Sequence, residues 1–266
     1  MAHQLLGTGS FGEVFLVERK SDKALLAMKV LSKKKVKQQN LKKYALTERN
    51  VMCAMEHPFI VQLRYAFQTT DHLFLISDYC AGGDLSQYLE IEGSFPEDKA
   101  KLYAQEILLG IEALHAQNII FRDLKPDNVI IDKHGHALLT DFGLSKEHVR
   151  RGEYGARSFC GSYAYLAPEM LKKSGHGKAV DWYLLGVILF EMITGLPPFY
   201  ADDKEQLFEN IVTDELNLSE LKQKASKECI DLIVKVSTIK HAEKLPNSCL
   251  KKILPNGLGL KKMQLK

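Results

Sequence analysis

Cysteine is scarce in this chain and has no organised spacing. The 266 residues contain five cysteines, and none of them belongs to a C-x-x-C pair. Zinc sites and disulfide frameworks need cysteines at regular spacings, and disulfides need them in pairs. The sequence therefore excludes a disulfide-stapled fold and a cysteine-based zinc site. It predicts reduced thiols in the cytoplasm, with the nucleus as a second possibility.

Long apolar runs and a strong charge bias are also missing. The longest apolar run, residues 182–190, is well short of the ~20 residues that span a membrane. No basic and apolar leader of the signal-peptide type follows Met1. The 36 basic and 33 acidic side chains leave a net charge of only +3. We therefore expect no membrane span and no nucleic acid partner.

What remains is the composition of an ordinary globular protein, 45% hydrophobic and 26% charged. Before residue 80 the chain carries β-prone runs at 14–17, 24–31, 59–67 and 73–79, and a helical period at 40–55. After Gly82 and Gly83 the pattern is mostly helical, with helices expected at 95–115, 180–194, 204–213 and 227–236. The lysines at 33–37 suit a solvated loop or a helix start. The sequence predicts a small β-rich lobe followed by a larger helical one.

A G-x-G-x-x-G pattern at residues 7–12 points to phosphate binding. Dinucleotide-binding folds share this pattern, but there a helix opens at the third glycine. Here β-prone residues follow Gly12, so a nicotinamide dehydrogenase is disfavoured. A glycine turn between two strands can instead close over phosphates with its backbone N–H groups.

Two charged residues stand where the pattern is otherwise apolar. Lys29 lies within a β-prone run, and Glu48 lies on the apolar face of the helix at 40–55. Each has a simple alternative: Lys29 could extend its ammonium to water, and Glu48 could sit at the edge of the apolar stripe. A buried charge is costly without a partner, so the two residues explain each other as an ion pair.

Four further segments carry polar residues between apolar stretches. They are Arg122-Asp123-Leu124-Lys125-Pro126-Asp127-Asn128, Asp141-Phe142-Gly143, Ala167-Pro168-Glu169 and Asp181-Trp182. In this order, and with the glycine pattern and Lys29, they resemble the eukaryotic protein kinases. The stretches at 81–85 and 158–162 are similar to the AGC group, which contains the cyclic-AMP-dependent and ribosomal S6 kinases. The resemblance implies an α+β, bilobal protein-kinase fold.

The resemblance implies ATP and Mg²⁺ as cofactors and assigns a place to each group. Lys29, held by Glu48, would contact the phosphates, and Asp123 and Lys125 would act at the transferred group. Asn128 and Asp141 would carry Mg²⁺. The remaining ATP contacts would come from the phosphate loop, from the adenine pocket and from the backbone beside the adenine: Gly7, Thr8, Gly9, Ser10, Phe11 and Gly12; Val14, Ala27 and Ile130; Asp78 and Cys80.

The resemblance also implies protein substrates phosphorylated on serine or threonine, because Lys125 follows Asp123 by two places. Asp84, Asp127 and Glu191 match acids that bind arginines upstream of the acceptor in relatives, and Ser162 matches a substrate-side hydroxyl. Ser158 matches the phosphorylation site of the activation segment, whose phosphate Arg122 and Lys146 would bind. An upstream activating kinase and a monomeric state are expected.

The end of the chain departs from the family pattern. No arginine follows Arg157 and no Phe, Tyr or Trp follows Phe208, so the late arginine and the aromatic C-terminal motif of AGC kinases are missing. We expect an N-lobe at 1–79, a C-lobe at 80–236 and a poorly ordered divergent tail at 237–266. The alternative function is a nucleotide-binding, scaffold-like kinase domain with little turnover.

Overall fold

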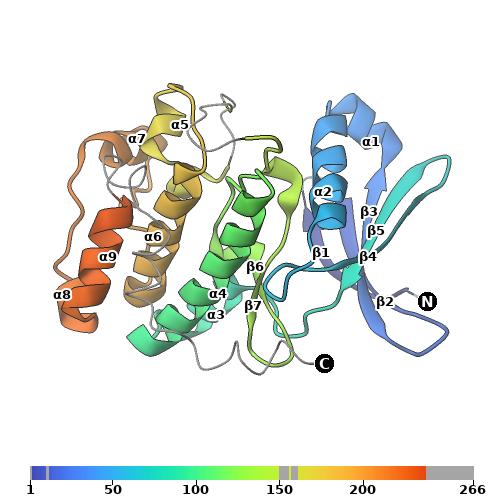
Figure 1. Ribbon diagram of the computed structural model, residues 1–266, viewed down its shortest axis with the longest axis horizontal. Helices are drawn as coiled ribbons and strands as arrows, with labels where there is room; N and C mark the ends of the chain where they lie inside the picture. Colours follow the sequence, from blue (N-terminus) through green and yellow to red (C-terminus); the bar gives the residue numbers. More distant parts are fainter. Residues whose placement is uncertain (1, 10–11, 150–155, 157–160, 238–266) are drawn as a thin grey trace.

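The computed structural model describes residues 2–9, 12–149, 156 and 161–237. Ser10, Phe11, Ser158 and the predicted tail beyond Ser237 lie outside the described residues. Two lobes lie side by side in Figure 1, a sheet with two helices and a larger helical body. The predicted α+β, bilobal fold is confirmed.

The small lobe is built on an antiparallel sheet in the order β1-β2-β3-β5-β4. β3 lies at its centre, between β2 and β5, so the residues of β3 are paired on both sides. A short helix, α1, and a longer one, α2, accompany the sheet (Figure 1). The bounds are β1 (Ala2–Gly9), β2 (Gly12–Glu18), β3 (Leu25–Ser32), α1 (Lys33–Gln38), α2 (Lys42–Ala54), β4 (Leu63–Gln68) and β5 (His72–Asp78).

Among its described residues, the large lobe is helical apart from one short hairpin, β6–β7, which lies near the sheet (Figure 1). α6 is buried along nearly its whole length because its sequence is apolar on all sides. The bounds are α3 (Leu85–Glu92), α4 (Glu97–Ala116), η1 (Pro126–Asn128), β6 (Val129–Ile131), β7 (Ala137–Leu139), η2 (Phe142–Leu144), η3 (Tyr163–Tyr165), α5 (Pro168–Leu171), α6 (Ala179–Thr194), α7 (Lys204–Thr213), α8 (Leu221–Lys224) and α9 (Lys227–Ser237).

One hydrophobic core joins the two lobes. Met52 of α2 belongs to the same buried cluster as Phe121 and Phe142 of the large lobe, and Leu63 of β4 packs against it. The rings of Phe121 and Phe142 lie 5.5 Å apart. α2 is therefore fixed from the large-lobe side as well as by the sheet.

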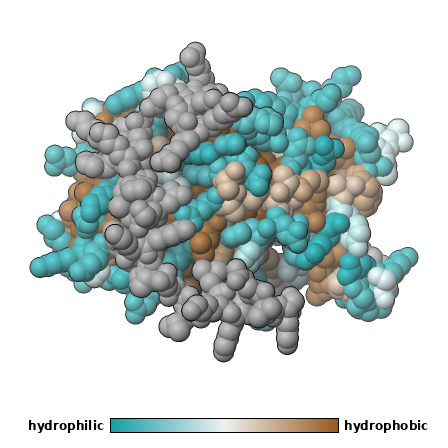
Figure 2. Space-filling model, viewed as in Figure 1, coloured by the Kyte–Doolittle hydropathy of each residue, from teal (hydrophilic) through white to brown (hydrophobic). Residues whose placement is uncertain are grey.

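On the face of the molecule drawn in Figure 2, hydrophobic residues are visible in patches between hydrophilic residues. None of the described helices is long and apolar enough to cross a membrane.

The contact between α6 and α9 depends on a glycine. A Cβ placed on Gly186 would overlap Cγ2 of Val236 and lie 2.9 Å from the hydroxyl of Ser237. We expect Gly186→Ala to lower the free energy of unfolding by about 1–3 kcal/mol, as overpacking of a core does. Thermal unfolding measures this. Gly7→Ala is the control, since a Cβ there meets nothing within 4 Å, and an equal loss in both variants would contradict the account.

Candidate active site

A buried lysine joins the sheet to α2 and to the large lobe. The ammonium of Lys29 lies 2.6 Å from Glu48 Oε1 and 3.3 Å from Asp141 Oδ1. The Lys29 and Glu48 side chains are only 16% and 5% exposed. Burial alone would lower the pKa of Lys29, but the two carboxylates reverse this and raise it above its ordinary value. The predicted ion pair is confirmed, and the alternative that each charge points to water is wrong.

A second buried carboxylate holds the loop that carries Asp123. Asp181, in α6, is fully buried and accepts hydrogen bonds from the backbone N–H groups of Phe121 (2.9 Å) and Arg122 (2.8 Å). A ring nitrogen of His115 lies 2.7 Å from the same carboxylate. Arg122 has a φ of 70°, a left-handed conformation that is costly for a residue with a side chain. Asp181 therefore stabilises a strained backbone immediately before Asp123.

The polar groups of the next segment converge on Asp123. The side-chain amide of Asn128 donates to the carboxylate of Asp123 (2.8 Å) and to its backbone carbonyl (2.7 Å). Lys125 donates to the hydroxyl of Ser162 at 3.0 Å, and the backbone N–H of Ser162 donates to the Asp123 carboxylate. Burial raises the pKa of Asp123, while Lys125 and Asn128 act in the opposite direction. A hydrogen-bonded carboxylate of this kind can receive a proton from a substrate hydroxyl.

The same arrangement leaves oxygen ligands for a divalent cation. Because Asn128 uses its amide nitrogen on Asp123, its amide oxygen stays available, and the Asp141 side chain is 38% exposed. Among the described residues there is no group of three or more His, Cys, Asp or Glu that could hold a metal. Mg²⁺ suits such a site, since it takes one or two protein oxygens and completes its shell with waters and phosphates. The residues present therefore fit Mg²⁺.

The predicted phosphate loop joins the ends of two paired strands. Gly7, Thr8 and Gly9 end β1, Gly12 opens β2, and Gly9 faces Gly12 in the pairing. A Cβ on Gly12 would overlap the backbone carbonyl of Val30, so only glycine fits there. The turn itself, with Ser10 and Phe11, lies outside the described residues.

The residues predicted around the adenine come from three parts of the chain. Val14 pairs with Lys29 between β2 and β3, and Ala27 pairs with Leu16 two residues further along the same pair of strands. Ile130 lies in β6, Asp78 ends β5, and Cys80 follows it. The Asp78 carboxylate is held by Arg64 through two hydrogen bonds of 2.6 and 2.7 Å, and burial raises the pKa of the Cys80 thiol to about 12. Cys80 is therefore a neutral group here.

The three acids predicted to bind substrate differ in their surroundings. Asp84 caps α3 and accepts hydrogen bonds from Ser86 and from Gln87, so its carboxylate serves the fold. Glu191 is buried, and both of its oxygens lie within hydrogen-bond distance of the Tyr165 hydroxyl (2.9 and 2.8 Å). Asp127 is exposed and close enough to influence the titration of Glu191. The predicted acidic subsite is thus represented by Glu191 and Asp127, which interact electrostatically, while Asp84, the third predicted member, caps α3.

The predicted phosphate clamp lies near the end of β7. Arg122 is buried and donates from Nε to the carbonyl of Leu144 at 2.8 Å, and Lys146 forms a backbone bridge to Ile120. This places Arg122 beside the start of the activation segment. Ser158 lies outside the described residues.

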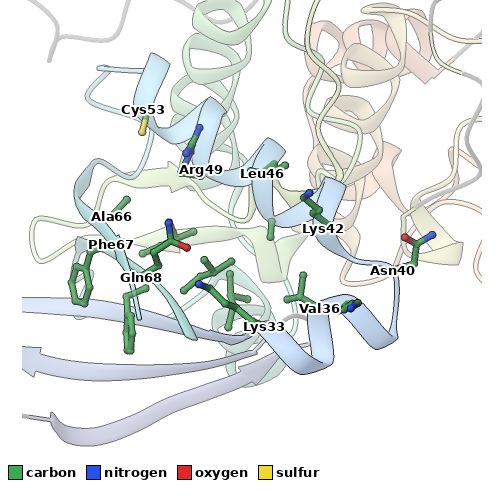
Figure 3. A pocket seen from close by; sticks show the side chains of 16 residues that line it. Lys33, Val36, Asn40, Lys42, Leu46, Arg49, Cys53, Ala66, Phe67 and Gln68 are labelled. Atoms are coloured by element: carbon green, nitrogen blue, oxygen red, sulfur yellow. The ribbon is translucent and has the colours of Figure 1, made fainter. Parts of the chain in front are cut away.

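Sequence reasoning missed a pocket on the outer side of α2. It has a volume of about 730 Å³ and is lined by apolar side chains together with several cations. Figure 3 shows Leu46, Arg49 and Cys53 of α2 facing Phe67 and Gln68 of β4 across it. Of the lining residues of α2, Leu46, Arg49 and Cys53 lie more than a quarter-turn from Glu48 around the helix, whereas Ala45 lies closer to the Glu48 face. A ligand in this pocket would thus act on the helix that positions Glu48. Its lining is divided among β3, α1, α2, β4 and β5, so no local sequence pattern could reveal it.

Comparison with known proteins places the chain among enzymes of one kind. The protein kinase domain matches residues 1–252. The serine/threonine-protein kinase Sgk2 of Homo sapiens is 46% identical over 216 residues, which cover 81% of this chain and 59% of that protein. The RAC family serine/threonine-protein kinase homolog of Dictyostelium discoideum is 45% identical over 213 residues, 80% of this chain and 48% of that protein.

Protein kinase 3 of Dictyostelium discoideum is 44% identical over 223 residues, 81% of this chain and 24% of that protein. The matched region thus spans between about a quarter and three-fifths of the length of these relatives.

Proposed function

The chain belongs to the protein kinase domain family, and from this premise we propose that it transfers the γ-phosphate of ATP to serine or threonine residues of proteins. One observation supports the proposal most directly. The charges of Lys29, Glu48 and Asp141 meet, and Asp141 acts electrostatically on Asp123, whose carboxylate accepts hydrogen bonds from Asn128 and from the backbone of Ser162. A scaffold that only binds nucleotide has no need of the second half of this arrangement.

The residues divide the reaction between them. Lys29, kept charged by Glu48 and Asp141, holds the phosphates of ATP by charge and hydrogen bonds. Asp123 accepts the hydrogen bond of the substrate hydroxyl and orients it, and Lys125, anchored on Ser162, stabilises the charge of the transferred group. When bound by Asn128 and Asp141, Mg²⁺ supplies positive charge opposite the phosphates. Positioning and electrostatics account for most of the catalysis in such a reaction.

The function is tested with peptides that differ only in the acceptor. Serine, threonine and tyrosine versions of one arginine-containing peptide are incubated with Mg²⁺ and ATP labelled in the γ position. Transfer to serine and threonine but not to tyrosine is the expected result. Transfer to none of the three peptides by folded, monodisperse protein would overturn the proposal.

We also propose that arginine upstream of the acceptor is recognised by Glu191 and Asp127. Support comes from the buried carboxylate of Glu191, whose titration the exposed carboxylate of Asp127 influences. A guanidinium binds carboxylates through paired hydrogen bonds, which an ammonium cannot reproduce. Tyr165 orients Glu191 for such a contact.

This recognition should depend on pH. Burial raises the pKa of Glu191 to about 7, Tyr165 opposes the rise, and Asp127 adds to it. Below that pH the carboxyl is neutral and binds arginine poorly; above it the carboxylate forms. We expect the KM of an arginine peptide to fall about tenfold between pH 6 and pH 8, the change in ionised fraction of such a group.

The change in KM should disappear in Glu191→Gln and for a peptide whose arginine is replaced by alanine. A KM that varies equally with pH for both peptides would contradict the assignment. Because the free carboxylate is buried, its ionisation also costs stability. The free energy of unfolding of the unliganded protein should therefore decrease as the pH rises from about 4.5 to about 7.

We further propose that the protein acts as a monomer in the cytoplasm and is activated by an upstream kinase at Ser158. The position of Arg122 beside Leu144 supports the activation step, because a nearby guanidinium can order a phosphorylated segment. The proposed cytoplasmic location rests on the cysteine pattern of the sequence, five residues without a C-x-x-C pair, which suits a reducing compartment.

A further inference from the structure

A cation lies over two aromatic rings, one of which directly follows Ser162 in the chain. The ammonium of Lys204, in the first turn of α7, lies 4.0 Å from the ring centre of Tyr163 and 5.5 Å from that of Phe208. The two rings meet edge to face, 5.6 Å apart. The Tyr163 side chain is 47% exposed, and Lys204 is exposed as well. Together these residues present a positively charged, half-aromatic surface, here called the Lys204 corner.

The Lys204 corner adjoins the place where the acceptor hydroxyl must lie. Ser162 donates its backbone N–H to Asp123 and accepts a hydrogen bond from Lys125, and Tyr163 is the next residue. Successive Cα atoms of a bound peptide are 3.8 Å apart. A substrate residue next to the phosphoacceptor therefore passes within reach of Tyr163 and Lys204.

The corner and the acidic subsite lie on different sides of η3. Tyr163 and Tyr165 are two residues apart in a 3₁₀ turn, which has three residues per turn, so their side chains diverge. Tyr165 reaches the buried Glu191, whereas Tyr163 reaches α7. A substrate thus meets negative charge on one flank of its acceptor and positive charge on the other.

The position of Lys204 does not serve the stability of its helix. A cation in the first turn opposes the helix dipole, and Asp203 already caps α7 by accepting from the backbone of Gln206 at 2.8 Å. The preceding acid, Asp202, accepts a hydrogen bond from the Tyr200 hydroxyl at 2.9 Å. The rings of Tyr163 and Phe208 hold the ammonium where a passing peptide meets it.

We propose that Lys204 selects an acidic side chain, and rejects a basic one, at the substrate position next to the phosphoacceptor on the α7 side. The inference rests on the proposed function and adds a specificity-determining residue to it. The aromatic corner that would attract a substrate cation is already filled by the protein's own lysine. A substrate carboxylate pairs with that lysine while its apolar stem lies on Tyr163.

The test uses serine peptides with a constant arginine flank and Glu, Gln or Lys on either side of the serine. For one of the two neighbouring positions we expect kcat/KM to be about threefold higher with Glu than with Gln and about threefold lower with Lys, the size of an exposed charge pair. The ratio of kcat/KM for the Glu peptide to kcat/KM for the Lys peptide should approach one in Lys204→Met. It should invert in Lys204→Glu and persist in Lys204→Arg. It should also shrink at high salt.

Lys222→Met, on α8, is the matched control and should keep the wild-type ratio. A Glu-to-Lys ratio that is unchanged in Lys204→Met, or equal to one in the wild type, overturns the inference while leaving the proposed function intact. Absence of transfer to every peptide overturns the proposed function itself. Because Lys204 is exposed, its replacement should leave the fold intact, and thermal unfolding of each variant checks this.

Discussion

Replacing Lys29 by methionine is expected to abolish phosphoryl transfer and to destabilise the protein. Methionine keeps the apolar stem but removes the ammonium, so Glu48, which is 5% exposed, is left as a buried charge without its cation. Breaking a buried ion pair on one side costs about 3–5 kcal/mol. The phosphates of ATP lose a fixed positive group, and the rate should fall at least ~10²-fold.

The two effects can be separated. In Lys29→Met/Glu48→Met both charges are gone, so the free energy of unfolding should recover while transfer stays lost. Lys224→Met removes an exposed pair with Glu220 and should change stability by less than about 1 kcal/mol. Denaturant unfolding and peptide phosphorylation measure the two quantities. Full transfer by the single variant would contradict the role given to Lys29.

Replacing Asp123 by asparagine should remove catalysis and leave the ATP site in place. The amide has the shape of the carboxylate but cannot receive a proton, and general-base groups contribute about 10²–10⁴-fold. The hydrogen bond from Asn128 to the backbone carbonyl of Asp123 does not involve the changed group, so the loop should keep its position. Stability should change little, because burial already raises the pKa of Asp123 toward its neutral form.

Asp98→Asn is the control for this variant, since Asp98 is an exposed carboxylate in the first turn of α4. It should phosphorylate the peptide at the wild-type rate. A rate for Asp123→Asn within a few-fold of the control would mean that another group accepts the hydroxyl proton.

The ion pair at the centre of the site could be predicted from sequence because two costs cancel. A lysine within an apolar strand and a glutamate on an apolar helix face are each unfavourable, and pairing removes both penalties. This logic needs no knowledge of the fold. It predicted the Lys29–Glu48 contact across 19 positions of the chain.

Other features depend on contacts that local patterns do not contain. The β-prone run at 59–67 was expected to be one strand, but β4 begins only at Leu63. Phe59, Ile60 and Val61 are buried against the large lobe, where Ile60 bridges to Leu139 of β7, so their apolar character comes from core packing. An apolar run alone cannot distinguish these two reasons for burial.

The functional role of Asp181 was hidden for a similar reason. In the sequence it is one acid at the start of an apolar helix, recognised only as part of a family motif. Its bonds to the backbone of Phe121 and Arg122 span about sixty positions and require the full topology. The lysine-rich run at 33–37, by contrast, forms α1 because Ser32 caps it and Val36 anchors it in the small-lobe core.

The central claim is that Asp123 acts on the acceptor and Lys29 on ATP. The most direct measurement is a single-turnover reaction of Asp123→Asn with γ-labelled ATP, Mg²⁺ and the serine peptide, in which bound ATP and phosphopeptide are counted in the same sample. The account predicts wild-type ATP binding with almost no phosphopeptide, whereas wild-type protein converts its bound ATP. Phosphopeptide formed by the variant at the wild-type rate, or loss of ATP binding together with transfer, would contradict it.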